Sequence, residues 1–181
     1  MFQIRIHGRG GQGVVTAAEL IAISAFNNGW QSQAFPSFGV ERTGAPIEAF
    51  ARIDKNPIRT REHVYSPDFL IVQDASLLST VDVTKGCGQK TKIIINTSKL
   101  KTELSLNLPE ENIYTIDATK IALEIIGKNI VNTVIIGAFA KATNLFDLDS
   151  IQKAIEQKFA SKGKEIINKN IKAISKAYNL N

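Results

Sequence analysis

The sequence has 181 residues, of which 44% are apolar and 22% are charged, a composition typical of one compact globular domain. It contains no apolar run long enough to span a membrane, and its start, Met1–Ile6, lacks a signal-peptide core. The formal net charge is +5, but the basic residues are dispersed, so we expect no nucleic-acid partner. The single cysteine, Cys87, excludes an intrachain disulfide and a cysteine-ligated cluster built by this chain alone. Together these features predict a cytoplasmic protein that binds neither membranes nor nucleic acid.

The chain begins with a predicted strand and helix. Phe2–His7 alternates between apolar and polar residues, which predicts a strand. Apolar residues then recur at helical spacing through Gly13–Asn28, and Gly29 suits the end of that helix.

Extended segments are predicted next. Gln31–Phe38 is expected to be extended. Ile47–Asp54 and Ile58–Tyr65 flank the turn residues Lys55-Asn56-Pro57, which predicts a β-hairpin.

Three short apolar runs follow, and polar residues come directly after each run. The runs are Phe69–Val72 before Gln73-Asp74, Ile93–Ile95 before Asn96-Thr97-Ser98, and Ile113–Ile116 before Asp117-Ala118-Thr119. Such runs suit strands that are covered on both faces. The polar residues fit the rule that ligands bind outside the carboxyl ends of strands in open α/β sheets.

The last third of the chain is predicted to be helical. Helices are expected over Thr119–Gly127 and Val131–Thr143, over an amphipathic stretch marked by Leu148, Ile151, Ile155 and Phe159, and over another marked by Ile167, Ile171, Ile174 and Tyr178. We therefore predict a single α/β domain over residues 1–181, with three layers, a mixed sheet and a Rossmann-like glycine loop after the first strand.

The most informative motif is that loop, Gly8-Arg9-Gly10-Gly11-Gln12-Gly13, between the first strand and the first helix. The glycines let the backbone turn tightly and approach a ligand closely. The start of the helix favours an anion. A dinucleotide site also requires an acidic residue at the end of the second strand, but that region reads Gln31-Ser32-Gln33-Ala34-Phe35. From the residues alone, a dinucleotide site, another phosphate or carboxylate site, and tight packing without a ligand all remain open.

A second segment, Phe35–Pro46, combines two prolines and two glycines with Glu41 and Arg42. Apolar rings beside an arginine in a connecting loop are typical of a binding surface, although the phenylalanines can also fill the core. We predict that this segment lies beside the glycine loop and that Arg9 and Arg42 share one anion.

These two motifs together resemble the gamma subunit of the 2-oxoacid:ferredoxin oxidoreductases, and the pyruvate branch in particular. The resemblance rests on Gly8–Leu20 and Ala34–Pro46, and it continues through Tyr65–Val72 and through Asn132-Thr133 with Gly137-Ala138. Thr43 departs from the arginine that is more usual at its position. A branched-chain 2-oxoacid enzyme and a stand-alone NAD-binding protein are the alternatives.

The resemblance implies a complex that oxidatively decarboxylates pyruvate, passes the acetyl group to coenzyme A and reduces ferredoxin, reversibly. It implies alpha, beta and delta partner subunits, which would hold thiamine diphosphate and iron–sulfur (4Fe–4S) clusters. In this chain it implies no catalytic residue and no metal ligand. The candidate site, for coenzyme A or another anion or for a neighbouring subunit, comprises Gly8, Arg9, Gly10, Gly11, Gln12, Gly13, Thr16, Glu41 and Arg42.

Overall fold

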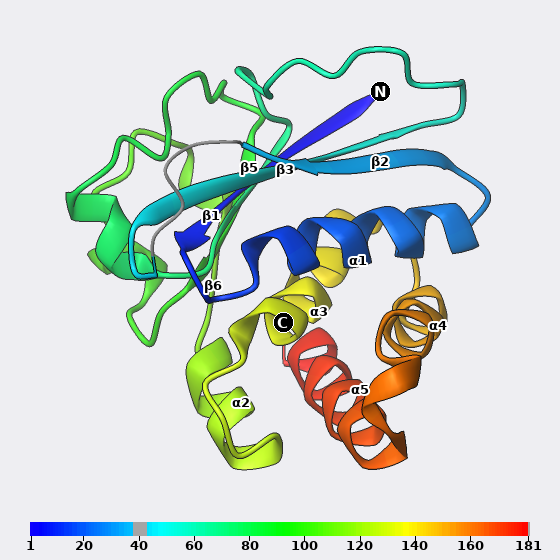
Figure 1. The fold of residues 1–181 in the computed structure, drawn as a ribbon. Coiled ribbons are helices and arrows are strands. Elements are labelled where there is room, and N and C mark those ends of the chain that lie inside the picture. Colours follow the sequence, from blue (N-terminus) through cyan, green and yellow to red (C-terminus); the bar gives the residue numbers. More distant parts are fainter. Residues whose placement is uncertain (38–42, 181) are drawn as a thin grey trace.

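The computed structural model describes residues 1–37 and 43–180 as one α/β domain (Figure 1). The strands are β1 (Phe2–Arg9), β2 (Gln31–Pro36), β3 (Pro46–Asp54), β4 (Phe69–Val72), β5 (Lys92–Asn96) and β6 (Ile113–Ile116). The helices are α1 (Val14–Asn27), α2 (Ala118–Ile125), α3 (Val131–Thr143), α4 (Leu148–Lys158) and α5 (Lys164–Asn179). Short 3₁₀ turns cover Ala75–Ser79, Lys101–Glu103, Glu110–Asn112 and Ala160–Lys162, and the first of these is η1.

The six strands form one mixed sheet in the order β2-β3-β1-β4-β5-β6. The first strand is central: it pairs antiparallel with β3 and parallel with β4. The strands β4, β5 and β6 run parallel to one another, whereas β2 pairs antiparallel with β3 at the sheet edge. The predicted fold class, a single α/β domain with a mixed sheet, is confirmed.

Within the described residues, all five α-helices pack on one face of the sheet, which is visible below the strands in Figure 1. The side chains of alternate strand residues, such as Ile4, Ile6 and Ile71, meet the helices in the larger hydrophobic core. The helix α3 is buried along almost its whole length. Because Gly137 has no side chain, α3 approaches α5 so closely that an added Cβ would lie 2.5 Å from the carbonyl oxygen of Ile174.

The opposite face is covered by loops and 3₁₀ turns. A smaller core there joins Leu70, Val72, Ile93 and Ile95 to Leu77 of η1 and to Val83. The apolar runs β4 and β5 are thus buried on both faces, as their composition predicted, and the third layer of the domain consists of loops.

The predicted strand over Ile58–Tyr65 is wrong. Both edges of β3 are already occupied by β2 and β1, so no edge is left for a hairpin partner. Side chains from the sheet hold this segment instead. Arg52 donates to the carbonyl oxygens of Glu62 and His63, and Gln33 Nε2 donates to the carbonyl oxygen of Thr60 at 2.6 Å.

Two buried arginines anchor the loop layer without a carboxylate hydrogen-bonded to either in the described part of the chain. Arg5 is 6% exposed and Arg52 is 1% exposed. Arg5 Nη1 donates to the carbonyl oxygen of Val64 at 3.2 Å, and its Nη2 donates to those of Val83 and Lys85 at 2.9 and 2.6 Å. Guanidinium–carbonyl bonds thus fasten the loop layer to the sheet.

Candidate functional site

The glycine loop joins β1 to α1 and depends on backbone conformations that favour glycine. Gly11 has a φ of 91° and Gly13 a φ of 72°. Gly8 is constrained by packing, because an added Cβ would lie 2.5 Å from Cγ2 of Val14. Three of the four glycines in this loop are therefore required by the backbone conformation or by the packing of this chain, whether or not a ligand binds.

The segment Phe35–Pro46 lies directly against this loop at its described end, residues 43–46. The backbone N–H of Gly10 donates to the carbonyl oxygen of Ala45 at 2.9 Å, and that of Gly44 donates to the carbonyl oxygen of Gly10 at 3.0 Å. Thr43 forms an isolated parallel bridge with Gly10. The predicted proximity of the two segments is confirmed for residues 43–46. Glu41 and Arg42 lie outside the described residues, and so does the predicted sharing of an anion by Arg42 and Arg9.

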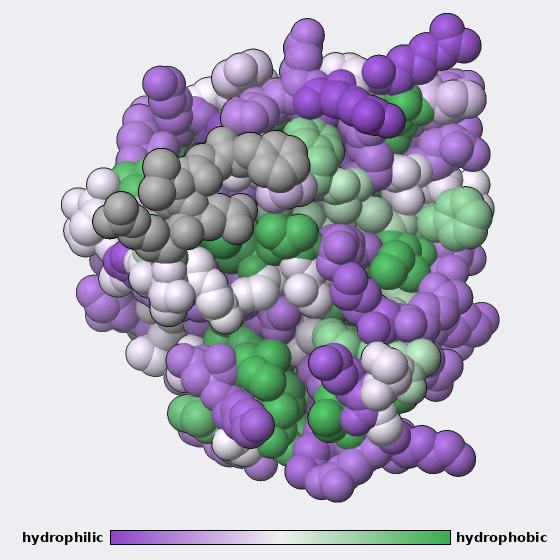
Figure 2. All heavy atoms as spheres, in the orientation of Figure 1, coloured by the Kyte–Doolittle hydropathy of each residue, from purple (hydrophilic) through white to green (hydrophobic). Residues whose placement is uncertain are grey.

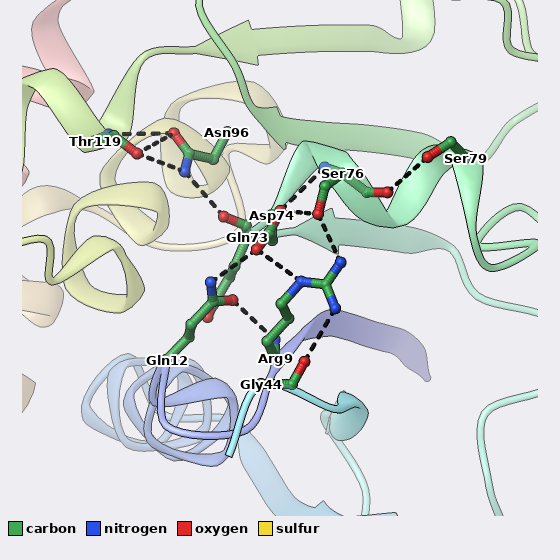
Figure 3. A network of polar contacts seen from close by, with 9 residues as sticks. All are labelled: Arg9, Gln12, Gly44, Gln73, Asp74, Ser76, Ser79, Asn96 and Thr119. Carbon is green, nitrogen blue, oxygen red and sulfur yellow. Dashed lines mark hydrogen bonds and ion pairs between the residues drawn. The ribbon is translucent and has the colours of Figure 1, made fainter. Parts of the chain in front are cut away.

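The side chain of Arg9 leaves the loop and points to the strand end of β4 (Figure 3). Its Nε donates to Oδ2 of Asp74 at 3.1 Å, its Nη2 to Oγ of Ser76 at 2.8 Å, and its Nη1 to the carbonyl oxygen of Gly44 at 3.0 Å. This guanidinium therefore links β1, the segment around Gly44 and η1.

Gln12 completes the same network. Its Oε1 accepts from the backbone N–H of Arg9 at 2.8 Å, and its Nε2 donates to Oδ2 of Asp74 at 2.9 Å. Burial of Asp74 opposes its ionisation, but the hydrogen bonds from Ser76 and Gln12 and the charge of Arg9 outweigh that effect and lower its pKa. Asp74 is therefore a carboxylate at neutral pH.

An anion could be held where the loop enters α1. This helix begins after Gly13 without a side-chain cap, so the N–H groups of its first turn point outward without a side-chain acceptor. A cavity of about 410 Å³ opens there, lined by Gly10, Gly11, Gly13, Val14, Val15, Thr43 and Ile47. The predicted site residue Thr16 is half-buried and follows the last lining residue of the helix.

A second cavity lies at the carboxyl ends of the parallel strands, and Gln12 is part of its lining. Its volume is about 260 Å³, and its lining is mostly polar: Gln12, Gln73, Asp74, Ala75, Ser76, Asn96, Thr119, Asn129 and Val131. Asn96 Nδ2 donates to the carbonyl oxygen of Gln73 at 2.9 Å and to Oγ1 of Thr119 at 3.0 Å, which ties β4, β5 and α2 together (Figure 3).

The sequence contains a signal for this second cavity. Gln73, Asp74, Asn96 and Thr119 are among the polar residues that follow the predicted strands, yet none of them was included among the candidate site residues. What the sequence did not reveal is that β4 lies next to β1, which brings Asp74 to the glycine loop.

The other titratable candidates do not form a catalytic group with the loop. His7 is 3% exposed, and burial, assisted by the charge of Arg5, lowers its pKa to about 3. Burial raises the pKa of the Cys87 thiol. Over residues 1–37 and 43–180, no cluster of three histidine, cysteine or acidic side chains could hold a metal ion. No helix in those ranges is long and apolar enough to cross a membrane.

Known proteins resemble this chain over almost its whole length. The sequence profile of the family described as "Pyruvate ferredoxin/flavodoxin oxidoreductase" matches residues 3–180. Pyruvate synthase subunit PorC of Methanosarcina barkeri is 57% identical over 86% of this chain and 85% of its own length. The pyruvate/ketoisovalerate oxidoreductases common subunit gamma of Thermococcus kodakarensis is 51% identical over 99% of this chain and 96% of its own length.

Solved structures agree with this likeness. The crystal structure of pyruvate oxidoreductase subunit PORC from Thermotoga maritima superposes with a TM-score of 0.83 and 36% identity, over 98% of this chain and 94% of that chain. The 2-oxoglutarate:ferredoxin oxidoreductase of Magnetococcus marinus, solved with 2-oxoglutarate, coenzyme A and succinyl-CoA bound, shares the fold at a TM-score of 0.78 and 20% identity. That match covers 99% of this chain and 30% of the longer chain.

Proposed function

This chain belongs to the pyruvate ferredoxin/flavodoxin oxidoreductase family and is the gamma subunit of a pyruvate:ferredoxin oxidoreductase, and from that premise we propose that its glycine loop handles coenzyme A. The complex then converts pyruvate, coenzyme A and oxidised ferredoxin to acetyl-CoA, CO₂ and reduced ferredoxin, reversibly. The observation that carries the role of the loop is the uncapped start of α1 above a cavity of about 410 Å³.

The redox chemistry of this complex belongs to partner subunits. Alpha, beta and delta chains hold thiamine diphosphate and the iron–sulfur clusters, and ferredoxin meets the complex through them. In support, the chain has a single cysteine, and its described residues offer no cluster of metal ligands. The cytoplasm is the proposed location of the complex.

Selection of the 2-oxoacid also belongs to the partners. The Thermococcus kodakarensis relative is named as a gamma subunit common to pyruvate and ketoisovalerate oxidoreductases. A subunit that serves both enzymes cannot by itself distinguish pyruvate from a branched 2-oxoacid.

The residues at the loop fit the phosphates of coenzyme A. Backbone N–H groups at a helix start bind phosphate, and the absence of a Cβ at Gly11 lets a phosphate approach the backbone. The two residues Glu41 and Arg42 remain in this proposed site on sequence grounds. Arg9 contributes by holding the loop against Asp74 and Gly44.

A subunit interface is the competing role for the same surface. Apolar side chains are exposed on the helical side of the molecule, including Leu123 at 53% and Ile130 at 37% exposure. Figure 2 shows apolar surface among hydrophilic side chains on the face that includes these helices. We assign this helical surface to partner subunits and the glycine loop to coenzyme A.

A pair of glycine substitutions tests the role of the loop in the intact complex. Gly11→Ala adds a methyl group at a φ of +91°, where its nearest neighbour would be Cγ2 of Thr43 at 3.9 Å. Gly29→Ala is the matched control, because Gly29 also has a positive φ, of +80°, and open space around it, but lies beyond the far end of α1. Both variants carry a similar backbone strain of about 1 kcal/mol.

We expect Gly11→Ala to raise the KM for coenzyme A about tenfold while the KM for pyruvate stays constant, and Gly29→Ala to change neither. An unchanged KM for coenzyme A in Gly11→Ala would refute the proposed role. Loss of the partner subunits on size exclusion, without a change in that KM for the complex that remains, would favour the interface. Arg42→Ala, assayed in the same way, tests the second segment.

A further inference from the structure

The strand β2 forms one edge of the sheet and is paired on one side only. It runs antiparallel to β3, and within residues 1–37 and 43–180 no strand lies on its other side. None of its six residues, Gln31–Pro36, is charged. Charged side chains commonly protect an edge strand from pairing with another chain, so this edge is a template to which a further strand can add.

The register identifies the backbone groups that lie at this open edge. The backbone N–H of Ser37 donates to the carbonyl oxygen of Glu48 at 3.0 Å, and this pair continues the register of β2 with β3. Hydrogen-bonded and non-hydrogen-bonded pairs alternate along an antiparallel ladder. The N–H and C=O groups of Ser32 and Ala34 therefore point away from β3, and Pro36, which has no N–H to offer, stands at the next outward position.

A groove of about 390 Å³ borders the same strand. It is lined by Ala22, Ile23 and Phe26 of α1, by Ser32 and Ala34 of β2, and by the end of α4. The helix α1 lies below β2 in Figure 1, and Ser32 Oγ donates to the carbonyl oxygen of Ala22 at 2.7 Å. Phe26 is 67% exposed although its side chain is large and apolar.

The open edge and the groove together fit an extended peptide. Residues that face each other on neighbouring strands point to the same side of the sheet, so a strand that pairs with Ser32 and Ala34 directs its alternate side chains toward α1. Those side chains enter the groove beside Ile23 and Phe26, which favours apolar residues at two positions, i and i+2. In complexes of this kind, main-chain hydrogen bonds give affinity and the pockets for alternate side chains give specificity.

A second copy of this chain is a poor occupant of the groove. Antiparallel pairing of β2 with its own copy sets Ser32 opposite Ala34, so the paired strand directs only small side chains into the groove. An edge of six residues also supplies only a fraction of the about 1,200 Å² that a stable interface between two free proteins buries. The occupant therefore needs further contacts to hold it, as a segment of a partner subunit in the same complex has.

We propose that β2 and this groove bind an extended segment of a partner subunit, which adds to the sheet as a further strand and inserts two apolar side chains, at alternate positions, against Ile23 and Phe26. This interface goes beyond the proposed function. It involves the second half of α1, whereas the glycine loop lies at the start of that helix.

Hydrogen exchange of the backbone amides, resolved to single residues by mass spectrometry, tests the pairing in the free chain and in the intact complex. We expect the amides of Ser32 and Ala34 to exchange quickly in the free chain and about a hundredfold more slowly in the complex, while the amides of Gln33 and Phe35 are slow in both. A short segment of a partner subunit, with apolar residues at alternate positions, should gain protection at the same time.

Two results of this measurement would overturn the proposal. One is equal exchange of the Ser32 and Ala34 amides in the free chain and in the complex. The other is protection of these amides in the free chain as its concentration rises, which would assign the edge to a second copy.

Ala34→Pro tests the backbone contact, because it removes an outward donor and no hydrogen bond to β3. We expect the melting temperature of the free chain to change little and the dissociation constant of the chain in the complex to rise about tenfold. Native mass spectrometry over a dilution series measures that constant. Ala34→Ser keeps the N–H and a small side chain, so this matched control should leave the constant unchanged. Equal constants for the two variants would contradict the pairing.

Phe26→Ala tests the groove in the same way. Since Phe26 is exposed, the free chain should keep its melting temperature, while the dissociation constant in the complex rises about tenfold. The control is Leu100→Ala, because Leu100 is 69% exposed but lies in the loop layer, before the 3₁₀ turn Lys101–Glu103. Equal constants for both variants would refute the groove contact. The KM for coenzyme A should stay unchanged in the assembled Phe26→Ala complex, so this inference and the role of the glycine loop can fail separately.

Discussion

Asn132 fills the space that a side chain on Gly13 would need. Its Nδ2 lies 3.4 Å from the carbonyl oxygen of Gly13 and donates to it, and a Cβ built on Gly13 would collide with that same amide. Asn132 is 7% exposed and belongs to the first turn of α3. The start of one helix is therefore fitted against the start of another, and the glycine loop is held in place by a residue far along the chain.

We predict that Gly13→Ala lowers the free energy of unfolding by about 3 kcal/mol, since it adds both a clash and a strained φ of +72°. In the Asn132→Ala background the amide is absent, and the same substitution should cost about 1 kcal/mol less. Urea denaturation of the two single variants and of the double variant measures this coupling. Strict additivity of the two substitutions would contradict the contact.

The buried His7 makes stability depend on pH. Its folded-state pKa of about 3 lies below the unfolded value of about 6.5. Above pH 6.5 both states are neutral at this residue. As the pH falls from 6.5 toward 3, only the unfolded chain takes up the proton, so the free energy of unfolding falls by about 2 kcal/mol between pH 6.5 and 5.

His7→Phe should abolish this part of the acid sensitivity, because no proton is taken up at that position in either state. Urea titrations at pH 7, 6 and 5 check the slope, and His63→Phe, at the other and exposed histidine, is the control. The proposed protonation behaviour fails if the stability curves of the wild type and His7→Phe run parallel over this range.

We expect Arg52 to protect the segment Ile58–Tyr65, which it holds against the sheet, from proteolysis. Arg52→Met loses the bonds to the carbonyl oxygens of Glu62 and His63, at an expected cost of about 2 kcal/mol. Trypsin should then cut faster at Arg59 and Arg61, which are exposed within that segment. The cleavage rate, followed by mass spectrometry, is the measurement.

Lys55→Met is the control for the Arg52 experiment, because Lys55 is exposed and stacks on Trp30 outside the segment. Arg52→Lys should give an intermediate cleavage rate, since one ammonium group cannot span both carbonyl oxygens as the guanidinium does. Equal cleavage rates in Arg52→Met and Lys55→Met would refute the fastening role.

Because α3 and α5 approach each other closely at Gly137, we predict that one added methyl group there lowers the stability of the protein. In most helix interiors, alanine in place of glycine stabilises by about 1 kcal/mol. Gly137→Ala should instead destabilise by about 2 kcal/mol, because its Cβ would lie 2.5 Å from the carbonyl oxygen of Ile174. Thermal unfolding measures the effect. Gly88→Ala, with no atom within 4 Å, should be close to neutral, and a Gly137→Ala protein as stable as that control would contradict the packing.

Local patterns predicted most of the fold. The apolar runs that became β4, β5 and β6 and the periodic stripes of α1, α4 and α5 specify their elements through neighbours in sequence. The Ile58–Tyr65 strand was wrong because strand pairing is decided by which edges are free, and β2 and β1 had taken both edges of β3. A hairpin pattern contains no information on that competition.

The candidate site was predictable only in part for the same reason. The glycine loop is a local motif, and its contact with the segment around Gly44 was anticipated. The approach of Asp74 to Arg9 depends on β4 lying beside β1 in the sheet, although the antiparallel strands β2 and β3 separate the two in the sequence. Spacing along the chain looks for an acidic residue at the end of β2, whereas the acidic residue that contacts the loop, Asp74, follows β4.

The contact of Asn132 with Gly13 joins residues 119 positions apart. During synthesis, the glycine loop leaves the ribosome long before the residue that secures it, and β1 must wait for both β3 and β4. A nascent chain shorter than about three-quarters of its length therefore carries an exposed central strand and an unfinished loop. The glycine loop therefore reaches its folded geometry only after α3 has docked, so the loop is among the last parts of the domain to form.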